Sequence, residues 1–273
     1  SSFNDNANKI ALNKQRVDPE TFHRTEYIEI IDARTGEAYK SYENQTDVSY
    51  GADVSFNSDA SKALVAHQSS DDEITNYVTY IDFTTDNMID IPVQGGSIMD
   101  MIFTDDGNVA VASLSYNDLT SAEDTAMHVI ECEPETAKVL WSRDLEYIAD
   151  ILSTSYTHMA SREVEVDGLT YSQIMINASK KLYVLDMHTG DDISTINTNA
   201  YIQKFFASTN GNMILLATSD GKASYYDALT ADIYNDYVLD VDDSIMDFTM
   251  SNKVFASRGY RSPNIIVMRF KTD

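Results

Sequence analysis

Two distant stretches of the chain share one pattern. "YIEIIDARTGE" (27–37) and "KLYVLDMHTGD" (181–191) each contain an apolar run, an acidic residue, Thr-Gly and a polar exit. The pattern recurs along the chain. The position of the acid is occupied by Asp32, Asp82, Glu131, Asp186 and Asp227 in five copies and by Met268 in the last. Their successive spacings are 50, 49, 55, 41 and 41 residues. A period of this length predicts an array of similar units, each of which buries a face against its neighbours.

A second pattern lies between the copies of the first. "SFNSDASKALVAHQ" (55–68), "IFTDDGNVAVAS" (102–113) and "FASTNGNMILLATS" (206–219) each have an aromatic residue, a polar turn and a β-rich run. Alternating Val, Ile, Tyr and Thr bounded by Asp-Gly, Asn-Gly and Thr-Gly favour β-hairpins, because these turn residues tolerate a positive φ. Helical periodicity is not sustained anywhere. Each repeat therefore predicts four antiparallel strands.

Four strands in every 40–55 residues predict an all-β chain, a β-propeller of about six four-stranded blades. The predicted repeats are approximately 2–49, 50–96, 97–146, 147–199, 200–243 and 244–273. We expect residues 1–273 to form a single propeller domain. The first repeat begins inside a strand and the last lacks a fourth strand, and a propeller must satisfy its edges by closing. Two alternatives follow: the chain is excised from a longer parent, such as one of seven or eight blades, or six blades close imperfectly.

These motifs resemble known families. "FTDDGNVAVAS" (103–113) resembles the first hairpin of a WD40-type or lactonase-like blade, and "LYVLDMHTGD" (182–191) is similar to strands of quinoprotein-type (PQQ-like) blades. "VIECEPETAKVLWSRDL" (129–145) resembles the same quinoprotein-type strands. The resemblance covers almost the whole chain and implies an architecture rather than an activity. Quinoprotein blades interlock through a tryptophan in each blade, whereas Trp141 stands alone here, so no quinone cofactor is predicted.

Composition narrows the classes of partner. The chain has 44 acidic and 19 basic residues, a formal charge of −25, which opposes nucleic acid and suits a basic protein or peptide. No apolar run is long enough to insert into a membrane. Cys132 is the only cysteine, so neither an intrachain disulfide nor a cysteine-based zinc site can form. Abundant Tyr, Asn, Ser and Thr favour an extracellular or cell-surface domain, with the cytoplasm as the alternative.

The candidate ligand-binding residues share one place in the repeat. Carboxylates stand at corresponding places in the predicted innermost strands of four repeats, and Gln203, followed by Lys204, occupies that place in the fifth. The four carboxylates are Asp53, Asp100, Asp150 and Asp247. Innermost strands line the central channel of a propeller, so these side chains would surround its mouth. Two interpretations stay open: capture of a cation such as Ca²⁺ or a basic peptide, and hydrogen bonds that fasten adjacent blades.

No catalytic motif is present. The sequence lacks a Gly-x-Ser-x-Gly elbow, a His-x-x-x-His pair and a phosphate-binding loop, so no catalytic residue is predicted. We expect a non-catalytic protein- or ligand-binding propeller that acts as the interaction or sensory module of a larger protein. The alternative is a lactonase-like propeller hydrolase with a metal ion held by the acidic channel mouth. No cofactor is predicted under the first hypothesis, and Ca²⁺ is the candidate under the second.

Overall fold

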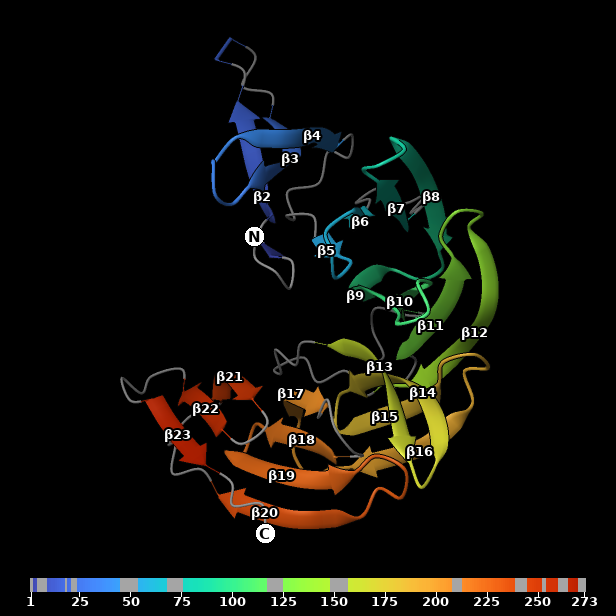
Figure 1. Cartoon of the computed structure of the whole chain (residues 1–273), viewed down its shortest axis with the longest axis vertical. Helices are drawn as coiled ribbons and strands as arrows, with labels where there is room; N and C mark the ends of the chain where they lie inside the picture. Colours follow the sequence, from blue (N-terminus) through green and yellow to red (C-terminus); the bar gives the residue numbers. More distant parts are fainter. Residues whose placement is uncertain are drawn as a thin grey trace. The chain divides into compact units, whose positions relative to one another are not determined.

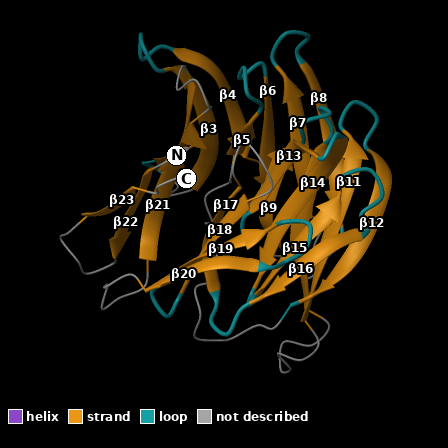
Figure 2. Cartoon of the chain, turned by 60° about the horizontal axis from the view of Figure 1, so that its bottom comes forward, coloured by secondary structure: helices purple, strands orange, loops and turns teal. Residues whose placement is uncertain are grey.

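The computed structural model describes most of the chain as β-strands. The described residues are 2–3, 9–17, 19–20, 24–44, 54–67, 76–116, 125–147, 157–207, 213–238, 245–251, 254–259 and 265–269. Within these ranges the regular elements are strands and no helix occurs (Figure 2). Nothing in the described residues could therefore cross a bilayer as a helix.

The strands form six antiparallel sheets, each built from strands consecutive in sequence (Figure 1). Sheet 1 contains β1 (Ser2–Phe3), β2 (Lys9–Val17), β3 (Arg24–Asp32) and β4 (Ala38–Asn44). Sheet 2 contains β5 (Val54–Phe56), β6 (Lys62–His67), β7 (Asn76–Asp82) and β8 (Asn87–Val93). Sheet 3 contains β9 (Ser97–Phe103), β10 (Val109–Tyr116), β11 (Thr125–Glu133) and β12 (Lys138–Glu146).

The second half of the chain repeats this plan. Sheet 4 contains β13 (Met159–Val166), β14 (Leu169–Ala178), β15 (Lys181–Asp186) and β16 (Asp192–Asn197). Sheet 5 contains β17 (Ile202–Ala207), β18 (Met213–Thr218), β19 (Lys222–Asp227) and β20 (Ile233–Val238). Sheet 6 has three described strands, β21 (Ile245–Ser251), β22 (Val254–Gly259) and β23 (Ile265–Arg269).

The chain divides into two compact units. Unit 1 comprises residues 1–117 and 127–144, and unit 2 comprises residues 118–126 and 145–273. In unit 1 the first strands of neighbouring sheets, β1, β5 and β9, lie side by side, and in unit 2 the first strands β17 and β21 do the same. The expectation of a single domain over residues 1–273 stays a prediction.

Each unit has its own apolar core between neighbouring sheets. In unit 1, Leu64, Tyr80 and Ile91 of sheet 2 are fully buried in one cluster with Val109 and Val111 of sheet 3. In unit 2 the equivalent cluster joins sheets 4 and 5, and its members include Leu182, Val184, Ile196, Phe205, Ile214 and Leu216. Burying one such side chain contributes about 1.5–3 kcal/mol, so packing between sheets is the main stabilising term.

The repeated acidic residue has a structural role. Asp32, the last residue of β3, accepts hydrogen bonds through Oδ1 from the backbone N–H groups of Arg34 (2.8 Å) and Thr35 (3.0 Å). These bonds hold the pKa of the Asp32 carboxyl below its usual value, with the Thr35 amide as the largest cause. The same pair of bonds recurs at Asp82, Asp186 and Asp227. The acid therefore closes the hairpin between the third and fourth strands of a sheet.

In sheet 3 the acid of this turn is Glu133, not Glu131 as the sequence alignment predicts. Strand β11 ends at Glu133, whose carboxylate accepts a hydrogen bond from the Thr136 hydroxyl at 3.1 Å. Glu131 is fully buried instead and accepts a hydrogen bond from the Trp141 indole at 2.7 Å. An alignment on acidic residues alone favours Glu131. The turn also has a threonine three residues after its acid, and only Glu133 has one.

All five described turns of this type share their backbone. Threonine is the third residue after the acid, and the fourth has a left-handed φ between 53° and 73°. The left-handed residues are Gly36, Asp86, Ala137, Gly190 and Ala231. Only glycine adopts this conformation without cost, so three of the five turns carry a conformational penalty.

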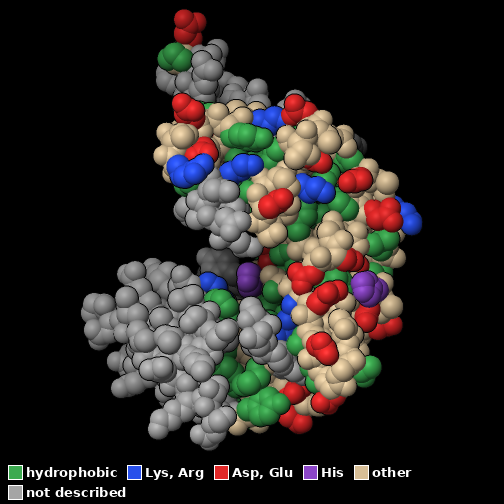
Figure 3. Space-filling view, viewed as in Figure 1, with side chains coloured by type: hydrophobic (Ala, Val, Ile, Leu, Met, Phe, Trp, Pro, Cys, Tyr) green, Lys and Arg blue, Asp and Glu red, His purple; other side chains and the backbone are tan. Residues whose placement is uncertain are grey.

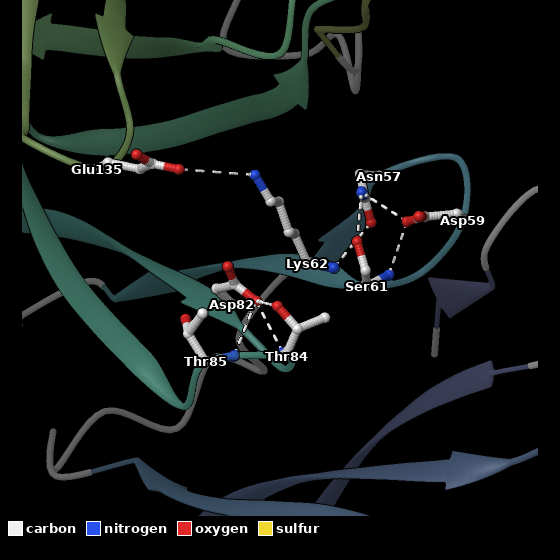
Figure 4. A network of polar contacts seen from close by, with 8 residues as sticks. All are labelled: Asn57, Asp59, Ser61, Lys62, Asp82, Thr84, Thr85 and Glu135. Carbon is white, nitrogen blue, oxygen red and sulfur yellow. Dashed lines mark hydrogen bonds and ion pairs between the residues drawn. The ribbon is translucent and has the colours of Figure 1, made fainter.

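The same turn fastens neighbouring sheets inside each unit. The residue after the acid in sheet 2, Phe83, is buried and meets the ring of Tyr39 on β4 edge-on at 5.6 Å. Lys40 forms an ion pair with Asp86 of that turn. Figure 4 shows the next junction, where Lys62 of sheet 2 extends to Glu135 in the turn of sheet 3, 4.0 Å away. In unit 2 the Ser194 hydroxyl donates to the carbonyl oxygen of Ala228.

Candidate functional site

The described candidate residues Asp100, Gln203, Lys204 and Asp247 stand in the first strands β9, β17 and β21, where a β-bulge determines which side chain occupies each place. In β9, Ile98 pairs with Ser113 and Asp100 pairs with Ala112, so Met99 is the extra residue. The same shift in strand pairing makes Gln203 the extra residue of β17 and Met246 the extra residue of β21. A bulge inserts one residue without a partner and re-aims the side chains beside it.

Because of this bulge, Lys204 rather than Gln203 corresponds to Asp100. Lys204 pairs with Ala217, and Asp247 occupies the same place in β21, where it pairs with Arg258. In each strand an apolar residue follows, and both Met101 and Phe205 are buried. We call this place, immediately before the buried apolar residue of the first strand, the first-strand position. The side chain of Asp247 lies outside the described residues.

In sheet 4 the first strand is not where the sequence places it. Strand β13 begins at Met159, which is buried and pairs with Ile176. The long β13–β14 hairpin turns at Asp167-Gly168, whose φ values are 53° and 78°, a two-residue turn that fixes this register. The residue before Met159 is His158, so a histidine occupies the first-strand position. Asp150, which the sequence predicts there, lies outside the described residues, as does Asp53 of sheet 2.

The described first-strand side chains differ in setting. Asp100 is half-buried and accepts a hydrogen bond from the backbone N–H of Met101 at 2.9 Å. The ring of His158 is tilted against that of Phe205 in the next sheet, with 5.4 Å between centroids. Buried Asn177 holds this junction, because its Oδ1 accepts from the His158 backbone N–H at 2.7 Å and its Nδ2 donates to the Ile202 carbonyl at 3.4 Å.

The described first-strand side chains differ in chemical type. Asp100 in unit 1 is acidic, and in unit 2 His158 carries an imidazole and the half-buried Lys204 an ammonium. Among the described residues no group of three His, Cys, Asp or Glu side chains is arranged to hold a metal ion. The predicted Ca²⁺ site therefore stays a prediction that depends on Asp53, Asp150 and the side chain of Asp247.

A second candidate is an open hollow of about 640 Å³ in unit 1, at the end of the β7–β8 hairpin remote from its acidic turn. We call it the β8 hollow, and its lining residues are Asn76, Tyr77, Asp90, Pro92, Val93, Gln94 and Gly95. The floor is fixed by Asn76, whose Nδ2 donates to the carbonyl oxygens of Gly95 (2.9 Å) and Gly96. Gly95 has φ of 104°, and an added Cβ would lie 2.9 Å from the Leu114 carbonyl oxygen, so only glycine fits there.

The sequence analysis missed the β8 hollow. No motif marks it, because its residues come from the two faces and the end of one hairpin. The available signal was the alternation in "NYVTYID" (76–82) and "NMIDIPV" (87–93), which places Tyr77 and Asp90 on one face of the sheet. That signal locates the two side chains but cannot reveal an unfilled space beside them.

Comparison with known proteins gives a fold but no family. No protein-family model and no curated protein matches the chain. A chain of the mitotic checkpoint complex crystal structure matches 99% of this chain and 74% of its own length, with a TM-score of 0.65 at 9% identity. The β-propeller domain of the trilobed protease from Pyrococcus furiosus matches 97% of this chain and 78% of its own, with a TM-score of 0.58 at 10% identity. The Dos1 propeller matches 89% and 63%, with a TM-score of 0.59 at 12% identity.

The chain is a β-propeller. The six described sheets agree with a propeller of about six blades, so the predicted all-β fold and the resemblance to WD40-like propellers are confirmed at the level of fold. An identity of 9–12% carries no activity from these proteins to this propeller. Its function has to be argued from its own side chains.

Proposed function

We propose that this propeller is a non-catalytic binding module, which engages a protein or peptide partner and serves as the interaction or sensory part of a larger protein. One observation carries the proposal: sheets 3 to 6 each have an ionisable residue at the first-strand position. These residues are Asp100, His158, Lys204 and Asp247. The following residue is apolar in every case and is buried wherever its side chain is described.

The contrast between neighbouring residues supports a binding role. A position that only stabilises the fold needs apolar volume, which Met101, Met159 and Phe205 already supply. The polar, ionisable side chains beside them add little to stability but give a surface that selects partners by charge. The acidic surface acts in the same sense, because acidic side chains are scattered over the face drawn in Figure 3 and attract basic partners from a distance.

The proposal is tested by capture of short synthetic peptides of basic, neutral and acidic composition on the immobilised chain, at low and at high salt. We expect retention of basic peptides, weakened by salt because exposed charges are screened. Asp100→Asn should reduce the affinity by about two- to fivefold, the worth of one exposed charge pair. Lys204→Gln should relax the discrimination against acidic peptides.

Matched controls lie away from the first-strand position, one at the opposite end of β13 from His158 and one on a fourth strand. Asp167→Asn changes an exposed carboxylate at the tip of the β13–β14 hairpin, and Lys138→Gln changes an exposed ammonium at the start of β12. Both should leave capture unchanged. Equal losses in the control and test variants would mean that net charge alone is sensed, and failure to retain any class of peptide would overturn the binding role.

Calcium is the one ion that we propose as an alternative occupant of the carboxylate positions, because oxygen ligands suit it. Capture repeated with added Ca²⁺ and with a chelator tests this. A Ca²⁺-dependent gain that disappears in Asp100→Asn would support the ion, and identical curves in both media would reject it.

A further inference from the structure

Tyr77 lines the β8 hollow, and His67 stands behind it on the same face of the sheet. His67 pairs with Tyr77 across β6 and β7, and Tyr77 pairs with Pro92 across β7 and β8, so the three side chains share one face of sheet 2. The rings of His67 and Tyr77 are stacked, with 4.5 Å between centroids and 14° between planes. This is a rigid, flat surface beside an open space.

The hollow is also lined by a carboxylate. Asp90 is exposed and stands two residues before Pro92, so it lies on the same face of β8 as the rings. Its Oδ1 accepts a hydrogen bond from the Thr79 hydroxyl at 2.7 Å, which orients the group. A carboxylate has about four lone-pair sites, so this bond leaves acceptor capacity for a ligand.

At neutral pH the charge of the β8 hollow is negative. Its lining residues include no lysine or arginine. Burial lowers the pKa of His67, against a smaller opposing effect of Asp90, so the imidazole beside the hollow is neutral. Burial, followed by Asp90, raises the pKa of Tyr77, so its phenol stays protonated. Asp90 is then the only charge among these groups.

We propose that the β8 hollow binds an alkylammonium group, namely the lysine side chain of a basic partner. The inference deepens the proposed binding function and adds a second contact away from the first-strand position. A lysine suits the space for two reasons: its methylene stem packs on rings, and its ammonium is attracted both to a carboxylate and to an aromatic face. The overall charge of −25 raises the local concentration of such cations.

The test uses Nα-acetyl-lysine-N-methylamide as the probe, with the norleucine and glutamate analogues as neutral and anionic comparisons, followed by ligand-observed NMR titration on the whole chain. We expect weak, salt-sensitive binding of the lysine probe and no saturation with the other two. Asp90→Asn should weaken binding by about two- to fivefold. Tyr77→Leu should weaken it further, whereas Tyr77→Phe keeps the ring and should bind like the unmodified chain.

The matched control is Asp144→Asn. Asp144 is also an exposed aspartate on a fourth strand, and it lies 2.7 Å from His128, but it is not among the lining residues of the hollow. Its substitution should leave the titration unchanged, and thermal melting should show each variant folded. Binding of norleucine as strong as that of lysine would overturn the proposal, as would no binding of lysine or an equal loss in Asp144→Asn. Peptide capture through the first-strand position would survive that failure, because Asp90 takes no part in it.

Discussion

Units 1 and 2 use the same strand plan but differ at the first-strand position. Unit 1 presents Asp100 there, whereas unit 2 presents a different residue in each of its three sheets: His158, Lys204 and Asp247. Both units, by contrast, have the same acidic turn with its threonine and its left-handed fourth residue. A feature that recurs unchanged in both units serves the fold, and a feature whose residue type varies from sheet to sheet is free to serve recognition.

The largest expected effect is a difference in stability between substitutions at two adjacent residues of unit 2, Phe205 and Lys204. Phe205→Ala removes a buried ring from the core between sheets 4 and 5 and should lower the free energy of unfolding by about 3–5 kcal/mol. Lys204→Ala, one residue earlier, should change it by no more than ~0.5 kcal/mol. Urea unfolding followed by circular dichroism measures both. A similar loss of unfolding free energy in both variants would show that Lys204 stabilises the fold, and the first-strand position could then no longer be contrasted with the structural turns.

The second prediction concerns unit 1. Trp141→Phe removes the indole N–H that donates to the buried Glu131 carboxylate at 2.7 Å, and it should cost about 1–3 kcal/mol because a buried acceptor loses a donor. Burial, followed by the Glu131 charge, raises the pKa of Cys132 to about 12, so the thiol is inert in the folded chain. Its labelling rate at mild pH therefore reports opening of unit 1, and that rate should rise in Trp141→Phe. An unchanged rate would contradict the prediction.

The third prediction tests the turns that the two units share. Gly36→Ala in unit 1 and Gly190→Ala in unit 2 should each destabilise by about 1 kcal/mol, because alanine is strained at positive φ. An added Cβ at Gly36 meets nothing within 4 Å, so the cost there is conformational. Ala137→Gly and Ala231→Gly should stabilise, by less than ~1 kcal/mol. Thermal melting of the four variants provides the check, and a loss in all four would disprove a shared turn geometry.

The smallest expected effect depends on pH and is confined to unit 1. The pKa of His67 is lowered by burial from 6.5, so between that value and its folded pKa the unfolded chain binds more protons. The contribution of His67 to stability is therefore complete above pH 6.5 and declines as the pH falls below it. Melting curves at mildly acidic and neutral pH should differ less in His67→Gln than in the unmodified chain. Equal differences would mean that the imidazole is accessible to protons when folded.

The fold could be predicted from sequence because the repeats carry local chemistry. The acid, the threonine and the left-handed residue of each turn lie within six consecutive residues, so the turn can be predicted without knowledge of tertiary contacts. The first-strand position was only partly predictable. The sequence predicts Asp100, but it aligns Gln203 rather than the adjacent Lys204 with it, because the bulge that shifts the register depends on pairing with β18. His158 was missed because the two-residue turn at Asp167-Gly168 extends the β13–β14 hairpin beyond the length that the other repeats suggest.

The backbone N–H groups that bond to Asp32, Asp186 and Asp227 lie two and three residues after each acid, so these contacts are short-range in sequence. Such short-range contacts require little loop-closure entropy and assemble early in folding. During synthesis, we expect each hairpin to be in place as it leaves the ribosome. Each newly synthesised hairpin can then pack against one that has already formed, which shortens the time that aggregation-prone strand edges stay unpaired.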